Sequence, residues 1–120
     1  MAERVLIISW GQPVRGREQH GLEVFGESVA YYNGLRDAGR VASFEVMILD
    51  PNGLMEGCML LGGSHAQLDS VREEERFRRL LIDASLIVDD LRIAEGYGAD
   101  GIEEAMGLYA DAVGRVPQMA

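Results

Sequence analysis

The sequence contains no lysine, and all eleven of its basic side chains are arginine. This absence excludes Schiff-base chemistry at a lysine and the lysine-containing phosphate loop. Acidic residues outnumber the arginines, and the formal net charge is −9. A nucleic-acid-binding face must neutralise phosphates with basic side chains, so we expect no DNA or RNA partner.

Cysteine and long apolar runs are also scarce. The single cysteine, Cys58, excludes an internal disulfide and suits a reducing compartment. We expect it to lie in the core, because a buried cysteine behaves as a small hydrophobe. The apolar run Val5 to Ile8 is too short for a signal peptide or a membrane span. We therefore expect a cytoplasmic protein with no membrane partner.

The most specific local pattern lies between Val41 and Gly62, where two apolar segments flank the turn sequence Asp50-Pro51-Asn52-Gly53. Proline presets φ in such a turn, and asparagine and glycine accept the positive φ that closes it. We predict a β-hairpin here. Both faces of its strands are largely apolar, so we expect the sheet to be covered on both sides.

The remaining segments alternate between strand and helix patterns in what we interpret as a single domain, residues 1–120. A helix with an apolar stripe should end at Gly39, and Ser64 with Gln67 forms a capping-box pattern for a second helix that the glutamates 73–75 can interrupt. Asp100 and Glu103 repeat the capping pattern. Besides the hairpin, the predicted elements are a strand Arg4 to Trp10, a helix Glu18 to Ala38 with the stripe Leu22, Phe25, Val29, Tyr32 and Leu35, a helix from Ser64 through Ala84, a strand Leu91 to Glu95 and a terminal helix from Asp100.

This order predicts an α+β fold, the ferredoxin-like βαββαβ arrangement with a four-stranded antiparallel sheet and an extra C-terminal helix. The two main helices cover one face of such a sheet. The terminal helix is too short to cover the opposite face of the sheet. A second copy of the sheet would cover it, so the pattern predicts a homodimer.

The element order and the segments Phe77 to Leu81 and Val88 to Ile93 resemble the dimeric α+β barrel superfamily. That superfamily includes cofactor-free antibiotic-biosynthesis monooxygenases, muconolactone isomerases and YCII-like proteins. The likeness is greatest to uncharacterised bacterial members that share the early Trp-Gly and a Gly-Gly-Ser turn. The resemblance implies paired sheets with an internal cavity, and no cofactor. No histidine occurs in the first predicted strand and no His-Asp pair of the YCII type is present, so no catalytic residue is carried over.

Trp10, Arg92 and Tyr97 are candidate ligand-binding residues. A tryptophan and an arginine beside an apolar cavity suit an aromatic or acidic small molecule, and Tyr97 could present a hydroxyl group. Alternatively, Trp10 packs in the core or in the dimer interface. Arg92 would then pair with a carboxylate across the sheet, for which the choices are Glu45, Glu56 and Glu95.

The two histidines and the loop after the first strand are the other candidates. His20 and His65 each lie where a loop enters a helix, and either could act as a general base near neutral pH. Neither belongs to an evident metal-binding pattern, so we predict no metal site. Arg15 and Arg17 precede the positive end of the first helix and could clamp an anion, or they belong to a mobile surface loop.

We therefore predict a homodimeric α+β barrel that binds a small organic molecule in its cavity. One alternative is a cofactor-free monooxygenase or isomerase that acts on an aromatic or polyketide-like substrate. Another is a non-catalytic protein interaction module that uses the acidic surface of the second helix.

Overall fold

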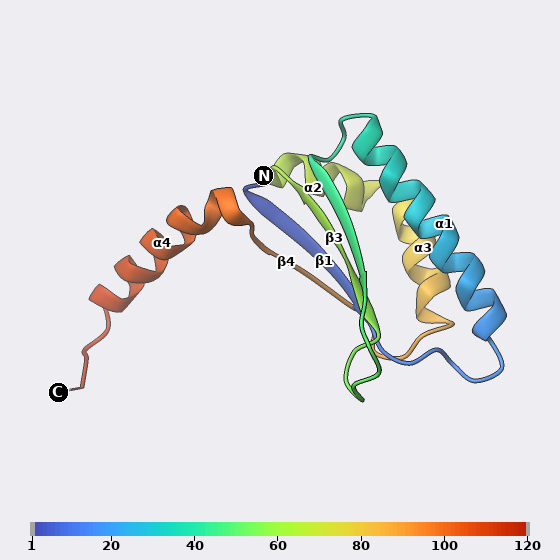
Figure 1. The fold of residues 1–120 in the computed structure, drawn as a ribbon. Coiled ribbons are helices and arrows are strands. Elements are labelled where there is room, and N and C mark those ends of the chain that lie inside the picture. The colour runs from blue at the N-terminus through green and yellow to red at the C-terminus, as the bar shows by residue number, and fades with distance from the viewer. Residues whose placement is uncertain (1, 120) are drawn as a thin grey trace.

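The computed structural model describes residues 2–119 and has an α+β architecture that is compatible with a ferredoxin-like fold (Figure 1). Its sheet is antiparallel, with four strands in the order β2-β3-β1-β4, as the predicted topology requires. The strands are β1 (Arg4–Trp10), β2 (Ser43–Ile48), β3 (Gly57–Gly63) and β4 (Arg92–Tyr97). The helices are α1 (Glu18–Asp37), α2 (His65–Glu73), α3 (Glu75–Ser85) and α4 (Ile102–Gly114), which follows the short 3-10 helix η1 (Ala99–Gly101).

The core lies between one face of the sheet and the helices α1, α2 and α3 (Figure 1). Side chains of a strand alternate between the two faces. On the central strand β1, Leu6 and Ile8 are buried while Ile7, between them, is 38% exposed. Leu6 pairs with Leu61 of β3, and both are fully buried. The helix-facing side of the two central strands is therefore the floor of the core.

Helix α1 ends where predicted, because Gly39 has a φ of +73°. Its predicted apolar stripe is only partly right. Tyr32 and Leu35 are buried, but Leu22 is 67% exposed. Val24 and Ser28, which the pattern missed, are buried in its place. The buried face of the helix is therefore rotated from the predicted one. Because one of the buried residues is a serine, the spacing of apolar residues did not reveal this face.

The second predicted helix is two helices, as the glutamate run suggested. Glu74 has extended backbone angles and separates α2 from α3. Its carboxylate accepts hydrogen bonds from the Tyr31 hydroxyl of α1 and from the Arg40 guanidinium, which also donates to Ser70 at 3.1 Å. Glu74 thereby ties the α2–α3 junction to the end of α1.

The hairpin between β2 and β3 forms with a longer connection than predicted. The strands end at Ile48 and begin at Gly57, and these two residues are paired across the hairpin. The side chain of Asn52 accepts from the backbone N–H groups of Leu54 and Met55 and donates to the carbonyl of Asp50. Asparagine side chains close such local turns readily, which explains the wider loop.

The caps of the later helices differ in outcome. The capping box of Ser64 and Gln67 is confirmed, with both of its hydrogen bonds present. The predicted caps at Asp100 and Glu103 are wrong: η1 leads into α4, and neither helix has a side-chain cap. The last strand runs to Tyr97, two residues beyond the predicted end, because its ladder with β1 continues to Arg4.

Helix α4 stands away from the rest of the chain and leaves the second face of the sheet uncovered (Figure 1). No residue of α4 is buried, and its apolar positions are exposed: Ile102, Met106, Leu108 and Tyr109. We call the uncovered side of the sheet the open face, and the strand alternation assigns to it the apolar residues Val5, Ile7, Met47, Leu60 and Ala94 and the polar residues Ser9, Glu45 and Arg92. Among residues 2–119, no helix has the length and apolar composition needed to cross a membrane.

The hydrogen bonds to Glu74 generate a prediction about stability. Burial would raise the pKa of this carboxyl, but the hydrogen bonds from Arg40 and Tyr31 and the charge of Arg40 outweigh it, so its pKa lies below 4.5. A lowered pKa stabilises the fold above the unfolded value, and this contribution is lost as pH falls through the folded pKa. We expect Glu74→Gln to lower the free energy of unfolding by about 1 kcal/mol at pH 7. The difference from the wild type should shrink below pH 4.5 in urea titrations followed by circular dichroism.

Glu73→Gln is the matched control, because Glu73 is exposed and has no hydrogen bond or ion pair within residues 2–119. It changes the net charge equally and should leave stability within about 0.5 kcal/mol of the wild type. Equal destabilisation by both variants would mean that net charge, and not the Glu74 contacts, accounts for the effect.

Candidate functional site

A cavity of about 400 Å³ lies between the helix-facing side of the sheet and the helices α1 and α3. Its volume is within the range that proteins use for small organic ligands. The floor comes from the strands and the loop before β3: Ile8, Trp10, Ile48, Glu56 and Met59. One wall comes from α1: Glu18, Gly21, Leu22, Val24, Phe25, Ser28 and Tyr32. The other wall comes from α3 and the segment after it: Leu80, Leu81, Ala84, Ile87, Val88 and Leu91.

Trp10 lies in this cavity at the end of β1, packed edge to face against Phe25 with 6.1 Å between ring centroids. Its position depends on Gly57, the residue opposite it on β3. A Cβ atom at Gly57 would lie 2.8 Å from the indole ring and 2.6 Å from the Met47 carbonyl oxygen. Glycine at this position therefore makes room for the indole on the cavity floor.

The loop after β1 closes one end of the cavity. It pairs with the segment after α3 through backbone hydrogen bonds from Gly11 N to Asp89 O, from Asp89 N to Gln12 O and from Val14 N to Ile87 O, each 2.8 Å long. Pro13 and Val88, which face each other in this ribbon, both line the cavity. The first half of this loop, Gly11 to Val14, is thus ordered against the connection between α3 and β4.

Few polar groups line the cavity. The carboxyl groups of Glu18 and Glu56 are two of them, and Glu56 accepts a 2.7 Å hydrogen bond from Gln12. Ser28 and Tyr32, both buried on α1, also line the cavity. Burial raises the pKa of the Tyr32 phenol, which keeps the hydroxyl group protonated. The cavity is therefore an apolar chamber with a few neutral or acidic polar groups.

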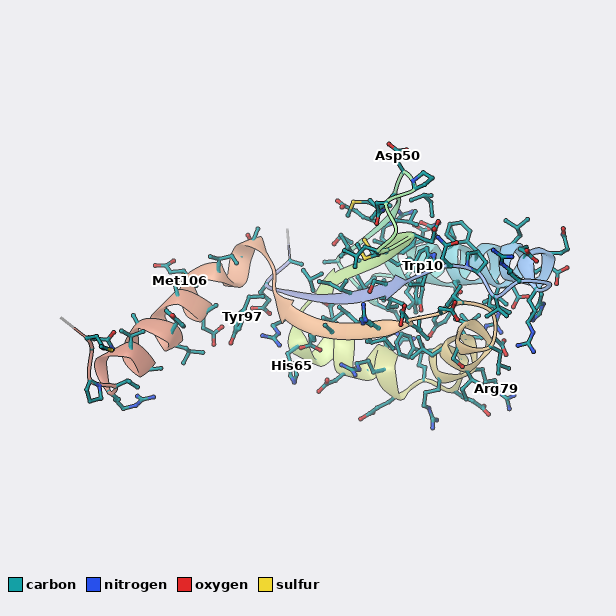
Figure 2. All side chains as sticks on the ribbon, turned by 90° about the horizontal axis from the view of Figure 1, so that it is seen from below. Trp10, Asp50, His65, Arg79, Tyr97 and Met106 are labelled. Carbon is teal, nitrogen blue, oxygen red and sulfur yellow. The ribbon has the colours of Figure 1, made fainter. Side chains whose placement is uncertain are left out.

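A second, smaller hollow of about 330 Å³ lies at the opposite end of β1, near the start of α4. It is lined by Glu3, Arg4, His65, Tyr97 and Glu104. The Arg4 guanidinium lies 4.4 Å from the centre of the Tyr97 ring, an arrangement that favours a cation–π contact. Figure 2 shows Tyr97 and His65 at this end of the molecule, away from Trp10. The hollow is polar where the first cavity is apolar.

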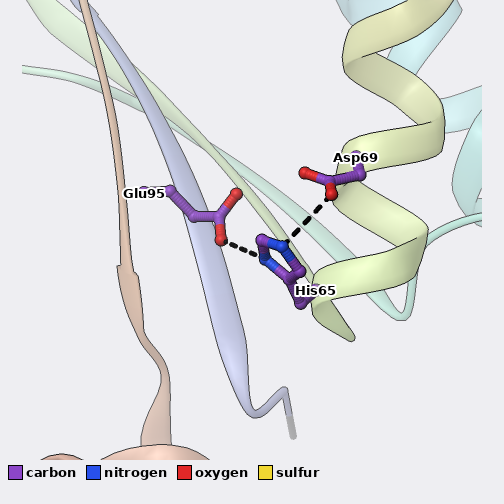
Figure 3. A group of neighbouring side chains, drawn as sticks. All are labelled: His65, Asp69 and Glu95. Carbon is purple, nitrogen blue, oxygen red and sulfur yellow. Dashed lines mark hydrogen bonds and ion pairs between the residues drawn. The ribbon is translucent and has the colours of Figure 1, made fainter.

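The imidazole of His65 lies beside this hollow, between two carboxylates (Figure 3). Its Nδ1 is 2.9 Å from Glu95 Oε2, and its Nε2 is 3.1 Å from Asp69 Oδ2. Arg4 donates two further hydrogen bonds to the same Glu95 oxygen, at 3.0 and 2.8 Å. Burial would raise the pKa of Glu95, but these hydrogen bonds and the charges beside them outweigh it and lower the pKa.

The predicted site residues are thus divided between separate places. Trp10 lines the apolar cavity, whereas His65 and Tyr97 border the polar hollow. Arg92 is exposed on the open face, opposite Ser9. The alternative pairing of Arg92 with Glu95 is wrong, because an odd separation along a strand places them on opposite faces and Arg4 binds that glutamate instead.

The loop and helix start before the cavity hold the remaining candidates. Arg15 is exposed and makes no hydrogen bond or ion pair with residues 2–119. Arg17 donates to the backbone carbonyl of Leu86, and the Glu18 carboxylate accepts from the Gly16 N–H. Within residues 2–119, the imidazole of His20 has one polar partner, the exposed carboxylate of Glu23 at 3.3 Å. The Glu18 carboxylate therefore already accepts from a backbone N–H group at the helix start where we expected an anion.

Two residues of the His65 cluster were not identified from the sequence as site residues. Asp69 follows His65 by four residues on one helix, a spacing that places both side chains on the same face and was available as a signal. The pairing of β4 with β1 brings Glu95 beside Arg4, which is 91 residues away along the chain, and within reach of His65. No local pattern in the sequence indicates that contact.

A comparison of the sequence with models of known protein families finds no match, and a comparison with curated proteins finds no significant similarity.

Proposed function

We propose that this protein binds a small, largely apolar organic molecule in the cavity between its sheet and its helices α1 and α3. The observation that carries the proposal is the cavity itself, about 400 Å³ in volume and lined mainly by aliphatic and aromatic side chains. Apolar walls with a few polar groups are typical of ligand pockets. Trp10 and Phe25 supply aromatic surface, and Tyr32 and Ser28 supply groups that can orient a ligand.

The lining favours binding over acid–base catalysis. Both histidines lie outside it, and its tyrosine has a raised pKa. The carboxyl groups of Glu18 and Glu56 are its acidic groups, and each already accepts a hydrogen bond from the loop after β1. A reaction in this cavity would have to use one of these engaged carboxyls. Binding requires only the apolar surface that is already in place.

The open face supports a homodimer as the functional form. Ile7 and Met47 are 38% and 42% exposed on it, and Ile7 pairs with the apolar Leu60 and Ala94, while the charged Glu45 and Arg92 lie on the two edge strands of the same face. An exposed apolar centre with a polar rim marks an interaction site in a folded protein. The same face on a second copy is a suitable partner, because a two-fold axis brings identical patches together.

Helix α4 supports the same partner. Ile102, Met106 and Tyr109 are spaced as one helical stripe and are 48%, 57% and 67% exposed. The helix extends away from the sheet (Figure 1), and none of its residues is buried against the rest of residues 2–119. In a dimer the stripe could pack on the second copy. The two exposed apolar surfaces of the chain would then be buried together.

The cavity can be tested with the uncharged dye N-phenyl-1-naphthylamine. Trp10 is the only tryptophan, so quenching of its fluorescence reports dye bound beside it. We expect the wild-type protein to bind the dye with quenching of Trp10. Ala84→Phe adds a ring to the cavity wall and should weaken binding about tenfold, which corresponds to about 1.4 kcal/mol.

Ala30→Phe is the matched control, because Ala30 is an exposed residue of α1 that does not line the cavity. It should bind the dye as the wild type does. Equal affinities of the two variants, or dye binding without Trp10 quenching, would place the dye elsewhere and contradict the proposal.

The dimer can be tested by size-exclusion chromatography with light scattering at micromolar concentration. We expect twice the chain mass for the wild type and a single-chain mass for Ile7→Glu. A carboxylate at the centre of the open face would be buried without a partner in the dimer, at a cost of several kcal/mol. Ile82→Glu, at a 61% exposed position of α3, should remain dimeric. A wild-type protein with the mass of one chain would refute the dimer.

A further inference from the structure

His65 and Asp69 are placed by the first two turns of α2 so that both side chains project from one face of the helix. The His65 Nε2 and the Asp69 Oδ2 are 3.1 Å apart. The two side chains are 66% and 54% exposed, so an ion in solution can reach the space beside them. The helix therefore holds the His65 nitrogen and the Asp69 oxygen at a set distance, and both atoms are accessible to solvent.

The tautomer of His65 follows from its other neighbour. The Nδ1 is 2.9 Å from Glu95 Oε2, and the same oxygen accepts two hydrogen bonds from the Arg4 guanidinium, which pairs with Glu95 as an ionised carboxylate. An ionised carboxylate only accepts hydrogen bonds, so the imidazole must donate its Nδ1–H to it. The side chain of Glu95 is 10% exposed and is fixed by two hydrogen bonds from Arg4. The ring is thereby held with its Nε2 towards Asp69 (Figure 3).

A neutral imidazole that donates through Nδ1 has a lone pair on Nε2. That lone pair faces an oxygen of Asp69, which is also an acceptor. Two acceptors 3.1 Å apart repel each other unless a cation lies between them, and the cation is either a proton or a metal ion. A metal ion with bonds of about 2.0 to 2.2 Å to nitrogen and oxygen holds neighbouring ligand atoms about 3.0 Å apart in octahedral geometry and about 3.4 Å apart in tetrahedral geometry. The observed 3.1 Å lies between these two values.

The charges around the pair also favour a metal ion. Asp69 has no arginine partner among residues 2–119, so its carboxylate is available. Glu95 is already paired with Arg4, and Arg72 lies 3.9 Å from its second oxygen. Glu95 is therefore suited to orient the imidazole and not to bind the ion itself. Glu3 and Glu104, which line the adjoining hollow with Arg4, add negative charge beside the site.

We propose that His65 Nε2 and the Asp69 carboxylate bind a divalent transition-metal ion, with Glu95 as the carboxylate that orients the imidazole. Imidazole with carboxylate suits zinc, nickel or copper and is a poor donor set for calcium or magnesium. A carboxylate that accepts from the second nitrogen of a metal-binding histidine is a recurrent arrangement. Two protein ligands leave coordination positions free for water or for a molecule in the hollow. This proposal is independent of the ligand proposed for the apolar cavity.

The test is isothermal titration calorimetry of the purified, chelator-treated protein with ZnCl₂. We expect one zinc ion per chain, lost in His65→Ala and weakened in Asp69→Asn. Glu95→Gln, which keeps both ligands but removes the orienting carboxylate, should weaken binding about 10- to 100-fold. Two-bond ¹H–¹⁵N spectra of the imidazole should show that zinc shifts Nε2 while Nδ1 keeps its proton.

His20→Ala is the matched control. His20 is the other histidine and also contacts a carboxylate on its own helix, at 3.3 Å from Glu23, but no second carboxylate holds its ring. This variant should bind zinc as the wild type does. Equal losses in the two histidine variants, or no zinc binding by the wild type, would overturn the proposal and assign the cation between His65 and Asp69 to a proton.

Discussion

The one-sided cover of the sheet is the constraint on which the rest of this structure depends. Three helices pack on the face that holds Leu6 and Ile8 of β1, and none of the described residues covers the opposite face. Because β1 is a central strand, its side chains alternate between the buried core on one face and the uncovered surface on the other. The apolar cavity and the polar hollow both lie on the helix side, at the two ends of this strand. The open face is what the one-sided packing leaves exposed.

Much of the fold could be predicted from local sequence patterns. The hairpin, the glycine that ends α1 and the capping box of Ser64 each depend on residues within a few positions of one another. These features form through hydrogen bonds and backbone angles of neighbouring residues, so they are present in the folded protein as predicted. The errors concern which side chains are buried, because tertiary packing determines this and local sequence does not. Leu22 fits an apolar stripe by spacing but lies at the rim of the cavity, because Val24 and Ser28 turn inward instead.

The terminal helix illustrates the limit of periodicity. Its apolar stripe correctly indicated a helix, and α4 is one. An apolar stripe indicates that one face of a helix will be buried, but it does not indicate which surface buries it. The helix buries none of its residues against the described part of the chain, so the surface that would cover its stripe lies outside residues 2–119. The same reasoning applies to the apolar residues of the open face, which follow the strand alternation and still lack cover.

The candidate site residues were predicted less well than the fold, since their grouping depends on strand register. Arg4 and Glu95 lie on neighbouring strands and share the helix-facing side, and only the β1–β4 ladder brings the glutamate within reach of His65. Trp10 is six residues from Arg4 on the same strand, which separates their Cα atoms by about 20 Å. An ion at His65 is therefore too far away to act on a molecule beside Trp10 in the same chain. Any chemistry in the apolar cavity must come from the groups that line it, and this separation is the physical reason to treat the cavity and the His65 cluster as two sites.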